Sequence, residues 1–215
     1  MSLPTEPPLT SYPPAPWHAS GQIWCALLTS RSPLKSPLTT CLIPHTLAAL
    51  LIRYQEGALR YDEFALVSVQ RRGHRIGLWT HCIWVDSATA LWGGRQIWGI
   101  PKQMAHFTWT NNTVAVSDAD GPLAELSFTP RVSVHTPFVV RFNAFGQRDR
   151  ALLLASSQAS GRLRPGRATI TQWVDRLPAL AHTRQRLALI AESAKIAVHR
   201  PRHLGHVPTE PHSGV

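Results

Sequence analysis

Residues 104–129 read MAHFTWTNNTVAVSDADGPLAELSFT, and this stretch decides the fold class. Two turn-forming pairs, Asn111-Asn112 and Asp120-Gly121, interrupt it. Asn, Asp and Gly favour turns because they tolerate the backbone conformations that tight connections need. The pairs separate three short segments that are rich in Thr, Val and aromatic side chains: 104–110, 113–118 and 122–129. This spacing predicts three antiparallel strands joined by tight turns, a β-meander.

Strand-like segments continue on both sides of the meander. Residues 184–198 suit either a strand or a helix, and one short helix is predicted at 44–51, where Pro44 precedes leucines three and four apart. Many short strands with few helices predict an antiparallel sheet that closes on itself and so avoids exposed edges. The remaining predicted strands are 22–29, 61–69, 78–85, 137–144, 150–158 and 166–173, the last two separated by Gly161 and Pro165-Gly166.

Composition favours one packed domain, because 44% of the 215 residues are apolar and eight are tryptophan. We expect a proline-rich lead at 1–16, a domain at 17–200 and a disordered tail at 201–215, since no apolar periodicity follows Arg200. No apolar run approaches the roughly 18 residues of a membrane span, and the lead lacks the features of a secretory signal. Three widely spaced cysteines favour reduced thiols, so we expect a cytoplasmic protein with no membrane partner.

The formal net charge is +10, but the basic residues are scattered and form no block of five or six. Net charge alone is a nonspecific signal, so a solvated basic surface is favoured over a nucleic-acid interface. A positive field would equally attract a small carboxylate. The spacing of His199, His203 and His206 superficially suggests a metal site, but a solvated tail fits better. We expect no metal, no cofactor and no nucleic-acid partner.

Directly before the meander, the sequence sets one lysine among apolar and aromatic residues. Lys102 follows Pro101, and Trp98, Ile100 and Met104 flank it. A lysine withdrawn from water loses part of the hydration that keeps it charged, which makes the neutral amine accessible. A neutral amine attacks carbonyl carbons and forms a Schiff base. For an isolated lysine the alternative is a surface side chain whose stem covers apolar area while its ammonium stays in water.

The same segment resembles the signature of the acetoacetate decarboxylase family, in which a Gly-Arg-Glu-x-x-x-x-Pro-Lys motif carries the Schiff-base lysine. The matching residues here are Gly94, Arg95, Gln96, Pro101 and Lys102. The similarity extends over most of residues 14–200, although only the part from Val85 to Phe107 is specific. Weaker similarities lie at Pro14–His18, at Arg60–Glu63 followed by Ala65–Val67, and at Trp84–Ser87.

The resemblance implies an α+β fold that is mainly antiparallel β, with a closed or partly closed β-barrel, a few peripheral helices and a central pocket. It makes 184–198 a closing strand and implies a homo-oligomer that acts on a small keto acid. It assigns Lys102 as the Schiff-base former and Glu63 as a general acid or base, or as a group that orients the amine. The expected substrate-binding residues are Arg95, Trp98, Ile100, Met104 and His81, with His106 nearby.

Several of these residues also have a structural alternative. Glu63 fits a strand-edge charge that pairs with Arg60 or Lys102. Arg95 fits a cap on the turn after the preceding glycines, because Arg suits both backbone and carboxylate contacts. Histidines near such a motif are more often hydrogen-bonded structural residues than parts of a pocket.

The chain departs from the family pattern at three places. Gln103 holds the place of a second lysine, and neither Ala19 nor Ser20 supplies the amino-terminal arginine. Residues 70–75 contain no acid in place of a second glutamate. Without a cationic neighbour, desolvation has to supply most of the bias toward a neutral amine. Three functions remain open: Schiff-base decarboxylation of a small keto acid, aldolase or dehydratase chemistry on a different keto acid, and noncatalytic small-molecule binding.

Overall fold

The computed structural model describes residues 12–38, 40–131, 133–182 and 186–207. Within them the chain forms many strands, one short α-helix and a π-helical turn. Their bounds are β1 (Trp17–Thr29), β2 (Thr40–Cys41), β3 (Thr46–Gly57), β4 (Tyr61–Arg72), β5 (Arg75–Val85), α1 (Ala88–Gly93), η1 (Gly94–Trp98), β6 (Lys102–Met104), β7 (His106–Thr110), β8 (Thr113–Asp118), β9 (Gly121–Pro130), β10 (Thr136–Arg148), β11 (Ala151–Trp173), β12 (Arg186–Val198) and β13 (Arg202–His206).

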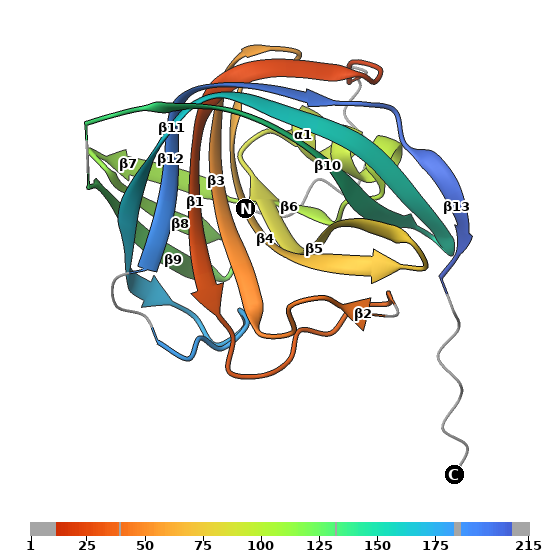
Figure 1. Ribbon diagram of the computed structural model, residues 1–215, viewed down its shortest axis with the longest axis horizontal. Helices are drawn as coiled ribbons and strands as arrows, with labels where there is room; N and C mark the ends of the chain where they lie inside the picture. Colours follow the sequence, from red (N-terminus) through yellow and green to blue (C-terminus); the bar gives the residue numbers. More distant parts are fainter. Residues whose placement is uncertain (1–11, 39, 132, 183–185, 208–215) are drawn as a thin grey trace.

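The central strands form a ring in the order β10-β5-β4-β3-β1-β12-β11, and β11 pairs back to β10 (Figure 1). Neighbours around the ring are antiparallel except β5 and β10, which run parallel. The predicted mainly antiparallel β fold is therefore confirmed, with α1 as the one α-helix in the described residues. The parallel seam is short, because only Leu78 with Ala144 and Trp79 with Phe145 pair across it.

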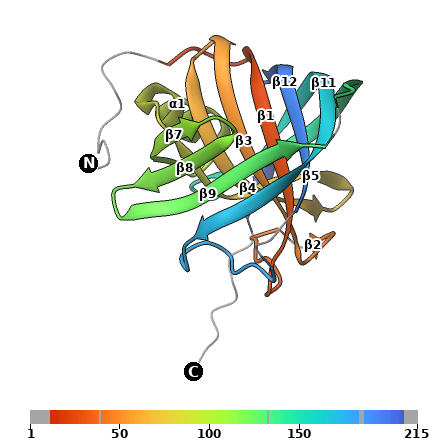
Figure 2. The ribbon, with the colours of Figure 1, turned by 90° about the vertical axis from the view of Figure 1, so that its left-hand side faces the viewer.

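The predicted meander is confirmed as β7, β8 and β9, and β9 joins it to β11. Figure 2 shows these strands beside β1, β3 and β4. The large apolar core lies between the two groups of strands, where Leu51, Phe64, Val114 and Leu126 have no solvent-exposed surface. The meander thus covers the outer face of β1, β3 and β4 with apolar side chains.

Strand β4 is buried on both faces, which explains the uninterrupted apolar run from Phe64 to Val67. Phe64 and Leu66 belong to the core under the meander, whereas Ala65 and Val67 line the interior of the ring. Successive side chains of a strand point to opposite faces. Glu63 therefore lies on the same inner face as Ala65, and the strand carries this carboxylate into a largely apolar interior.

The predicted helix at 44–51 is wrong, because β3 runs through Thr46–Gly57. Leu47 and Leu51 face the core under the meander, and Leu50 lines the ring interior between them. A strand with apolar side chains on both faces has leucines at spacings that also fit a helix. Pairing with β1 and β4 on its two edges decides the strand.

The strands predicted at 150–158 and 166–173 form one continuous strand, β11, so the predicted break between them is wrong. Gly161 does not make a turn. It allows close approach of β12, since a Cβ there would lie 2.3 Å from the carbonyl oxygen of Ser193. The closing strand implied at 184–198 is confirmed as β12, with residues 184 and 185 outside the described part of the chain.

The prediction of a disordered tail is wrong for Arg202–His206, which form β13 and pair with β11. Leu204 and Val207 pack against a small apolar cluster that includes Phe145 and Leu152. Two apolar contacts, one within β13 and one directly after it, anchor this segment, and two residues are too few to appear as periodicity in the sequence. Residues 208–215 of the predicted tail and 1–11 of the predicted lead lie outside the described residues.

Candidate active site

The segment that precedes Lys102 is a short helix followed by a π-helical turn. The Ser87 hydroxyl accepts a hydrogen bond of 3.2 Å from the Ala90 backbone N–H and so caps α1. The turn η1 ends at Gly99, whose φ of 65° lies in the left-handed region that glycine adopts freely. Strand β6 then adds to β5 in parallel, with Lys102 beside Ile83. Turns of this kind occur often at functional sites, because the extra residue re-aims the chain.

Gly93 and Gly94 let this segment approach the ring closely. A Cβ on Gly94 would lie 2.6 Å from Cδ of Lys102, so the lysine side chain runs directly across the Gly94 backbone. A Cβ on Gly93 would lie 2.6 Å from Cη2 of Trp17. Real Cβ atoms essentially never come that close to another heavy atom. Gly94 therefore leaves room for the lysine side chain, and Gly93 lets the segment pack against Trp17.

Lys102 and Glu63 form a buried ion pair inside the ring. The Lys102 Nζ donates to Glu63 Oε2 at 2.7 Å and to the Tyr61 hydroxyl at 3.2 Å. The side chains of Lys102 and Glu63 are 5% and 9% exposed. The amine and the carboxylate are within direct proton-transfer distance.

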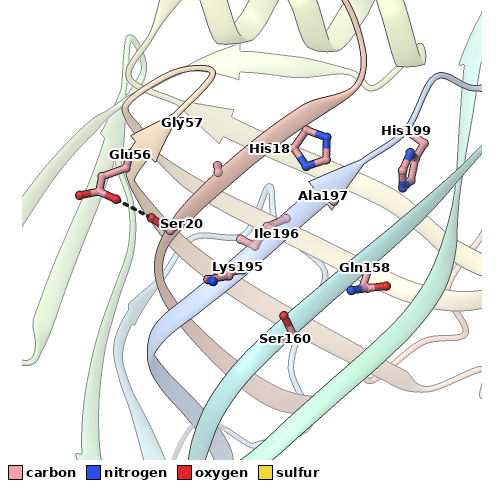
Figure 3. A pocket seen from close by; sticks show the side chains of 11 residues that line it. His18, Ser20, Glu56, Gly57, Gln158, Ser160, Lys195, Ile196, Ala197 and His199 are labelled. Atoms are coloured by element: carbon pink, nitrogen blue, oxygen red, sulfur yellow. Dashed lines mark hydrogen bonds between the residues drawn. The ribbon is translucent and has the colours of Figure 1, made fainter.

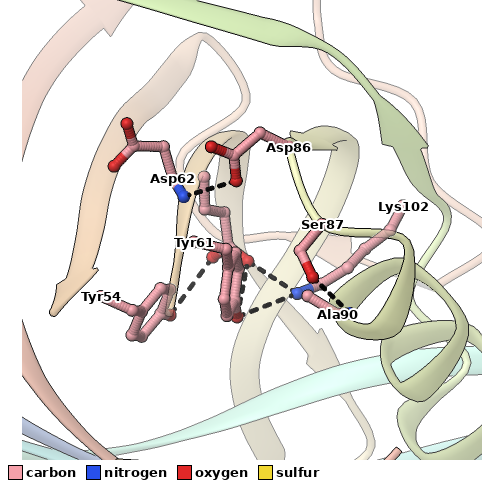
Figure 4. A network of polar contacts seen from close by, with 8 residues as sticks. Tyr54, Tyr61, Asp62, Asp86, Ser87, Ala90 and Lys102 are labelled. Carbon is pink, nitrogen blue, oxygen red and sulfur yellow. Dashed lines mark hydrogen bonds and ion pairs between the residues drawn. The ribbon is translucent and has the colours of Figure 1, made fainter. Parts of the chain in front are cut away.

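Two tyrosines complete this group, which we call the lysine cluster: Lys102, Glu63, Tyr54 and Tyr61. The Tyr54 and Tyr61 hydroxyls donate to the two oxygens of Glu63 at 3.4 Å each, and the rings stack at 4.4 Å (Figure 4). Burial, and next the charge of Glu63, raise the pKa of both phenols well above the ordinary value of 10.0. Both tyrosines therefore stay protonated and act as hydrogen-bond donors to the carboxylate.

The predicted site did not include the tyrosines. Tyr61 lies two residues before Glu63 on β4, so strand alternation places both side chains on one face. Tyr54 is the direct neighbour of Tyr61 across β3 and β4. The first relation is visible in the sequence once β4 is recognised. The second needed the register of β3, which the predicted helix at 44–51 concealed.

The lysine cluster opens on a cavity of about 140 Å³ in the ring interior. The predicted residues Trp98 and Ile100 line it, and the Trp98 indole N–H donates to the backbone carbonyl of His199 at 2.8 Å. Lys102 and Glu63 are the charged members of the wall, which is otherwise mostly apolar. The other lining residues are Trp17, Leu50, Ile52, Tyr54, Tyr61, Ala65, Val67, Leu78, Thr80, Ile83, Phe142, Ala144, Ser157, Ile196 and Val198.

Three predicted substrate-binding residues do not lie in this wall. The Arg95 Nε donates to the backbone carbonyl of Lys102 at 2.8 Å, so this guanidinium holds β6 from outside the cavity. Met104 lies two register positions beyond Lys102, beside Val85, and packs in the apolar cluster of α1. His81 is bonded through Nε2 to the Ser68 hydroxyl at 2.8 Å, and burial lowers its pKa from 6.5. His106 is exposed.

A larger hollow of about 530 Å³ lies on the other face of β1, β12 and β11 (Figure 3). His18 and Ser20 pair with Ala197 and Lys195, and all four line this hollow. The neighbouring positions Trp17 and Val198 face the lysine cavity instead. By size alone the outer hollow would be the candidate active site. The buried Lys102 amine and Glu63 carboxylate, however, lie in the smaller cavity.

Neither a metal-binding cluster nor a membrane-spanning helix occurs among the described residues. These residues contain no group of three or more His, Cys, Asp or Glu side chains that could hold a metal ion. No helix in the described part of the chain has the length and apolar character that crossing a membrane requires. Cys25 and Cys82 are free thiols, and burial raises the pKa of each to about 11.

A family model described as acetoacetate decarboxylase matches residues 2–148, which include Lys102, Glu63 and both tyrosines. The chain belongs to the acetoacetate decarboxylase family. The resemblance carried by the Gly94–Lys102 motif is thereby confirmed. No curated protein sequence matches the chain.

Solved structures related to this family share the fold. Acetoacetate decarboxylase from Legionella pneumophila subsp. pneumophila str. Philadelphia 1 has a TM-score of 0.68 at 15% identity, covering 95% of this chain and 93% of that one. The enduracididine biosynthesis enzyme MppR complexed with pyruvate has a TM-score of 0.67 at 19% identity, covering 91% and 93%. An acetoacetate decarboxylase-like enzyme from Sphingomonas wittichii RW1 has a TM-score of 0.61 at 14% identity, covering 89% and 94%.

Proposed function

We propose that this protein is a Schiff-base lyase that decarboxylates a small β-keto acid, with Lys102 as the nucleophile. The observation that carries the proposal is the buried Lys102 amine, 2.7 Å from Glu63 at the wall of an otherwise mostly apolar cavity. Membership of the acetoacetate decarboxylase family supports the same chemistry.

The first half of the reaction builds an electron sink. Glu63 takes a proton from the Lys102 ammonium, and the neutral Nζ attacks the ketone carbon of the substrate. One proton of the attacking nitrogen moves to the former ketone oxygen, which gives a neutral carbinolamine. The protonated Glu63 then returns its proton to the carbinolamine hydroxyl, and this oxygen leaves as water. The product is a cationic iminium that joins Nζ to the former ketone carbon.

The second half breaks the carbon–carbon bond. The electron pair between the α-carbon and the carboxylate moves toward the iminium nitrogen, carbon dioxide leaves, and a neutral enamine remains. A proton from water adds to the enamine carbon, and water then hydrolyses the new iminium. This step releases the shortened ketone and restores the Lys102 amine.

The cavity wall favours the step in which the substrate carboxylate leaves as neutral carbon dioxide. A carboxylate is poorly solvated among apolar side chains, whereas carbon dioxide is neutral. Among the lining residues the single cation is Lys102, and it becomes part of the iminium. The substrate carboxylate therefore lacks a second cation that would stabilise its charge before the carbon–carbon bond breaks. The two tyrosines hold Glu63 in place without adding charge.

Reduction with borohydride tests the proposal directly. The protein is incubated with acetoacetate, 3-oxohexanoate or pyruvate, treated with borohydride and mapped by peptide mass spectrometry, while carbon dioxide release is measured in parallel. We expect a stable adduct at Lys102 and release of carbon dioxide from a β-keto acid. Lys102→Arg should abolish both, because arginine stays protonated. Lys195→Arg, on the outer face of β12, is the matched control and should change neither.

Two results would contradict the proposal. An adduct at Lys102 that forms without carbon dioxide release from any β-keto acid would replace decarboxylation by other iminium chemistry. Absence of an adduct with every keto acid would show that Lys102 stays charged and that the cavity only binds its ligand.

A further inference from the structure

The cavity wall contains two polar side chains that take no part in the lysine cluster. Thr80 on β5 and Ser157 on β11 both line the cavity. Within the described residues, neither side-chain hydroxyl has a hydrogen-bond partner. Every polar side chain of the lysine cluster, by contrast, is bonded to another member.

Ser157 is the more unusual of the two. Its residue is 5% exposed, whereas Thr80 is only half-buried and can therefore bond to water. The Ser157 hydroxyl is not one of the fully buried side-chain atoms that lack a partner, so it is open to the cavity whose wall the residue forms. A ligand that fills the cavity would supply a hydrogen-bond partner for this hydroxyl.

Ser157 lies across the ring from the lysine cluster. Strand β4, which carries Glu63, is separated from β11 by β5 and β10 on one side and by β3, β1 and β12 on the other. Ser157 pairs with Phe142 on β10 and with Val198 on β12, and both also line the cavity. A ligand bound covalently to Lys102 would therefore direct its distal end toward Ser157.

The charge of the wall limits what this distal end can be. Glu63 and Lys102 are the charged lining residues, and they pair with each other. A second carboxylate on the ligand would be buried beside Ser157 without a cation, which is strongly unfavourable. A hydroxyl or carbonyl group would instead both fit the apolar surroundings and bond to the serine.

We propose that Ser157 determines substrate selectivity by hydrogen-bonding a neutral polar group at the distal end of a monocarboxylic β-keto acid. This inference rests on the proposed function, and it narrows the substrate class. The preferred acid carries one carboxylate, which is lost, and a short substituent with a hydroxyl or carbonyl group. Dicarboxylic keto acids are poor substrates.

A matched set of acids tests the inference: 3-oxohexanoate, 5-hydroxy-3-oxohexanoate and 3-oxohexanedioate. We expect kcat/KM to be at least about tenfold higher for the hydroxylated acid than for 3-oxohexanoate, and lowest for the diacid, as in sites built to bond a substrate hydroxyl. Ser157→Ala should bring the ratio between the first two acids close to one. Ser156→Ala removes the same group from the opposite face of β11 and should keep the wild-type ratio.

Several outcomes would overturn the inference. They are a wild-type ratio near one, an equal loss for both acids in Ser157→Ala, and preferred turnover of the diacid. Borohydride trapping at Lys102 reports separately on the proposed function. If no acid gives an adduct, the ratio is taken from dissociation constants measured by calorimetry, and equal constants or no binding would overturn the inference.

Discussion

Asp62 and Glu63 are neighbours on β4, both are buried, and each is paired with a cation, yet they sit in different surroundings. Asp62 accepts two hydrogen bonds from Arg53, at 3.1 and 3.3 Å, and one of 2.7 Å from the Trp109 indole. The Arg53 guanidinium also stacks over Trp109 at 4.5 Å. Glu63 faces the cavity and pairs with Lys102.

The difference lies in what surrounds each ion pair. On the outer face, Arg53 and Trp109 occupy the space around Asp62, and its backbone N–H donates to Asp86 at 2.8 Å. On the inner face, the Lys102 amine borders a cavity that a substrate could fill. Strand alternation thus gives one strand a structural carboxylate and a candidate catalytic carboxylate at adjacent positions.

The strongest test of this contrast is Glu63→Gln. Glutamine keeps the shape but cannot take the proton from the lysine, so kcat should fall by about 10²- to 10⁴-fold, the usual contribution of a general acid or base. The measurement is steady-state release of carbon dioxide from 3-oxohexanoate. Asp62→Asn is the paired comparison, and an equal loss in both variants would remove the distinction between the two faces.

A second test displaces the Lys102 side chain without changing the residue itself. Gly94→Ala puts a Cβ 2.6 Å from Cδ of Lys102, so the side chain has to move. Misplacement by about 1 Å costs on the order of 10²-fold in rate, and we expect a loss of that size. Gln96→Ala, an exposed position in the same turn, is the control. Normal kinetics in Gly94→Ala would show that the close contact does not position the amine.

Asp62→Asn should act on stability more than on turnover. The substitution weakens the charge-assisted hydrogen bonds with Arg53 and replaces the carboxylate that accepts from the Trp109 indole by a neutral amide. The free energy of unfolding should therefore fall by about 1–3 kcal/mol. Urea denaturation measures the loss, and kcat/KM should change far less than in Glu63→Gln. A variant as stable as the wild type would place Asp62 outside the structural network.

The smallest effect concerns His81, also bonded to the outer face of β4. Burial lowers its pKa below 6.5, so the unfolded chain takes up a proton at a higher pH than the folded protein. Stability should therefore decline as pH falls below about 6.5 toward the lower folded pKa. In His81→Gln this part of the decline should vanish between pH 7 and 5.5, as measured by urea midpoints. An unchanged slope, with His106→Gln as control, would contradict this expectation.

The sequence pointed to Lys102 and Glu63, which the structure pairs, better than to the other residues of the cavity wall. The Gly94–Lys102 motif indicates the lysine locally, and Glu63 lies in a segment that the sequence predicted as a strand, which the structure has as β4. The sequence did not indicate that the Arg95 side chain returns to the Lys102 carbonyl, because this contact depends on the π-helical turn. Ser157 carries no local signal, because its place in the wall follows from the closure of distant strands.

The fold was predictable where the residues that form an element are close in sequence. The meander has its turn residues at fixed spacing, and it was found as β7, β8 and β9. β3 and β11 were misread for one physical reason. Both strands contain apolar or glycine residues that contact parts of the chain far away in sequence. An example is Gly161, which lies close to Ser193.

The short seam between β5 and β10 has a dynamic consequence. Two residue pairs join these strands there, whereas β10 and β11 pair along their whole length from Thr136 to Arg148. Local opening free energies follow the number of contacts that have to be broken. Amide hydrogens at Leu78 and Ala144 should therefore exchange with deuterated solvent sooner than those deep in β1. Because Leu78 and Ala144 also line the cavity beside Lys102, an opening along this edge would expose that cavity to solvent while the rest of the molecule stays folded.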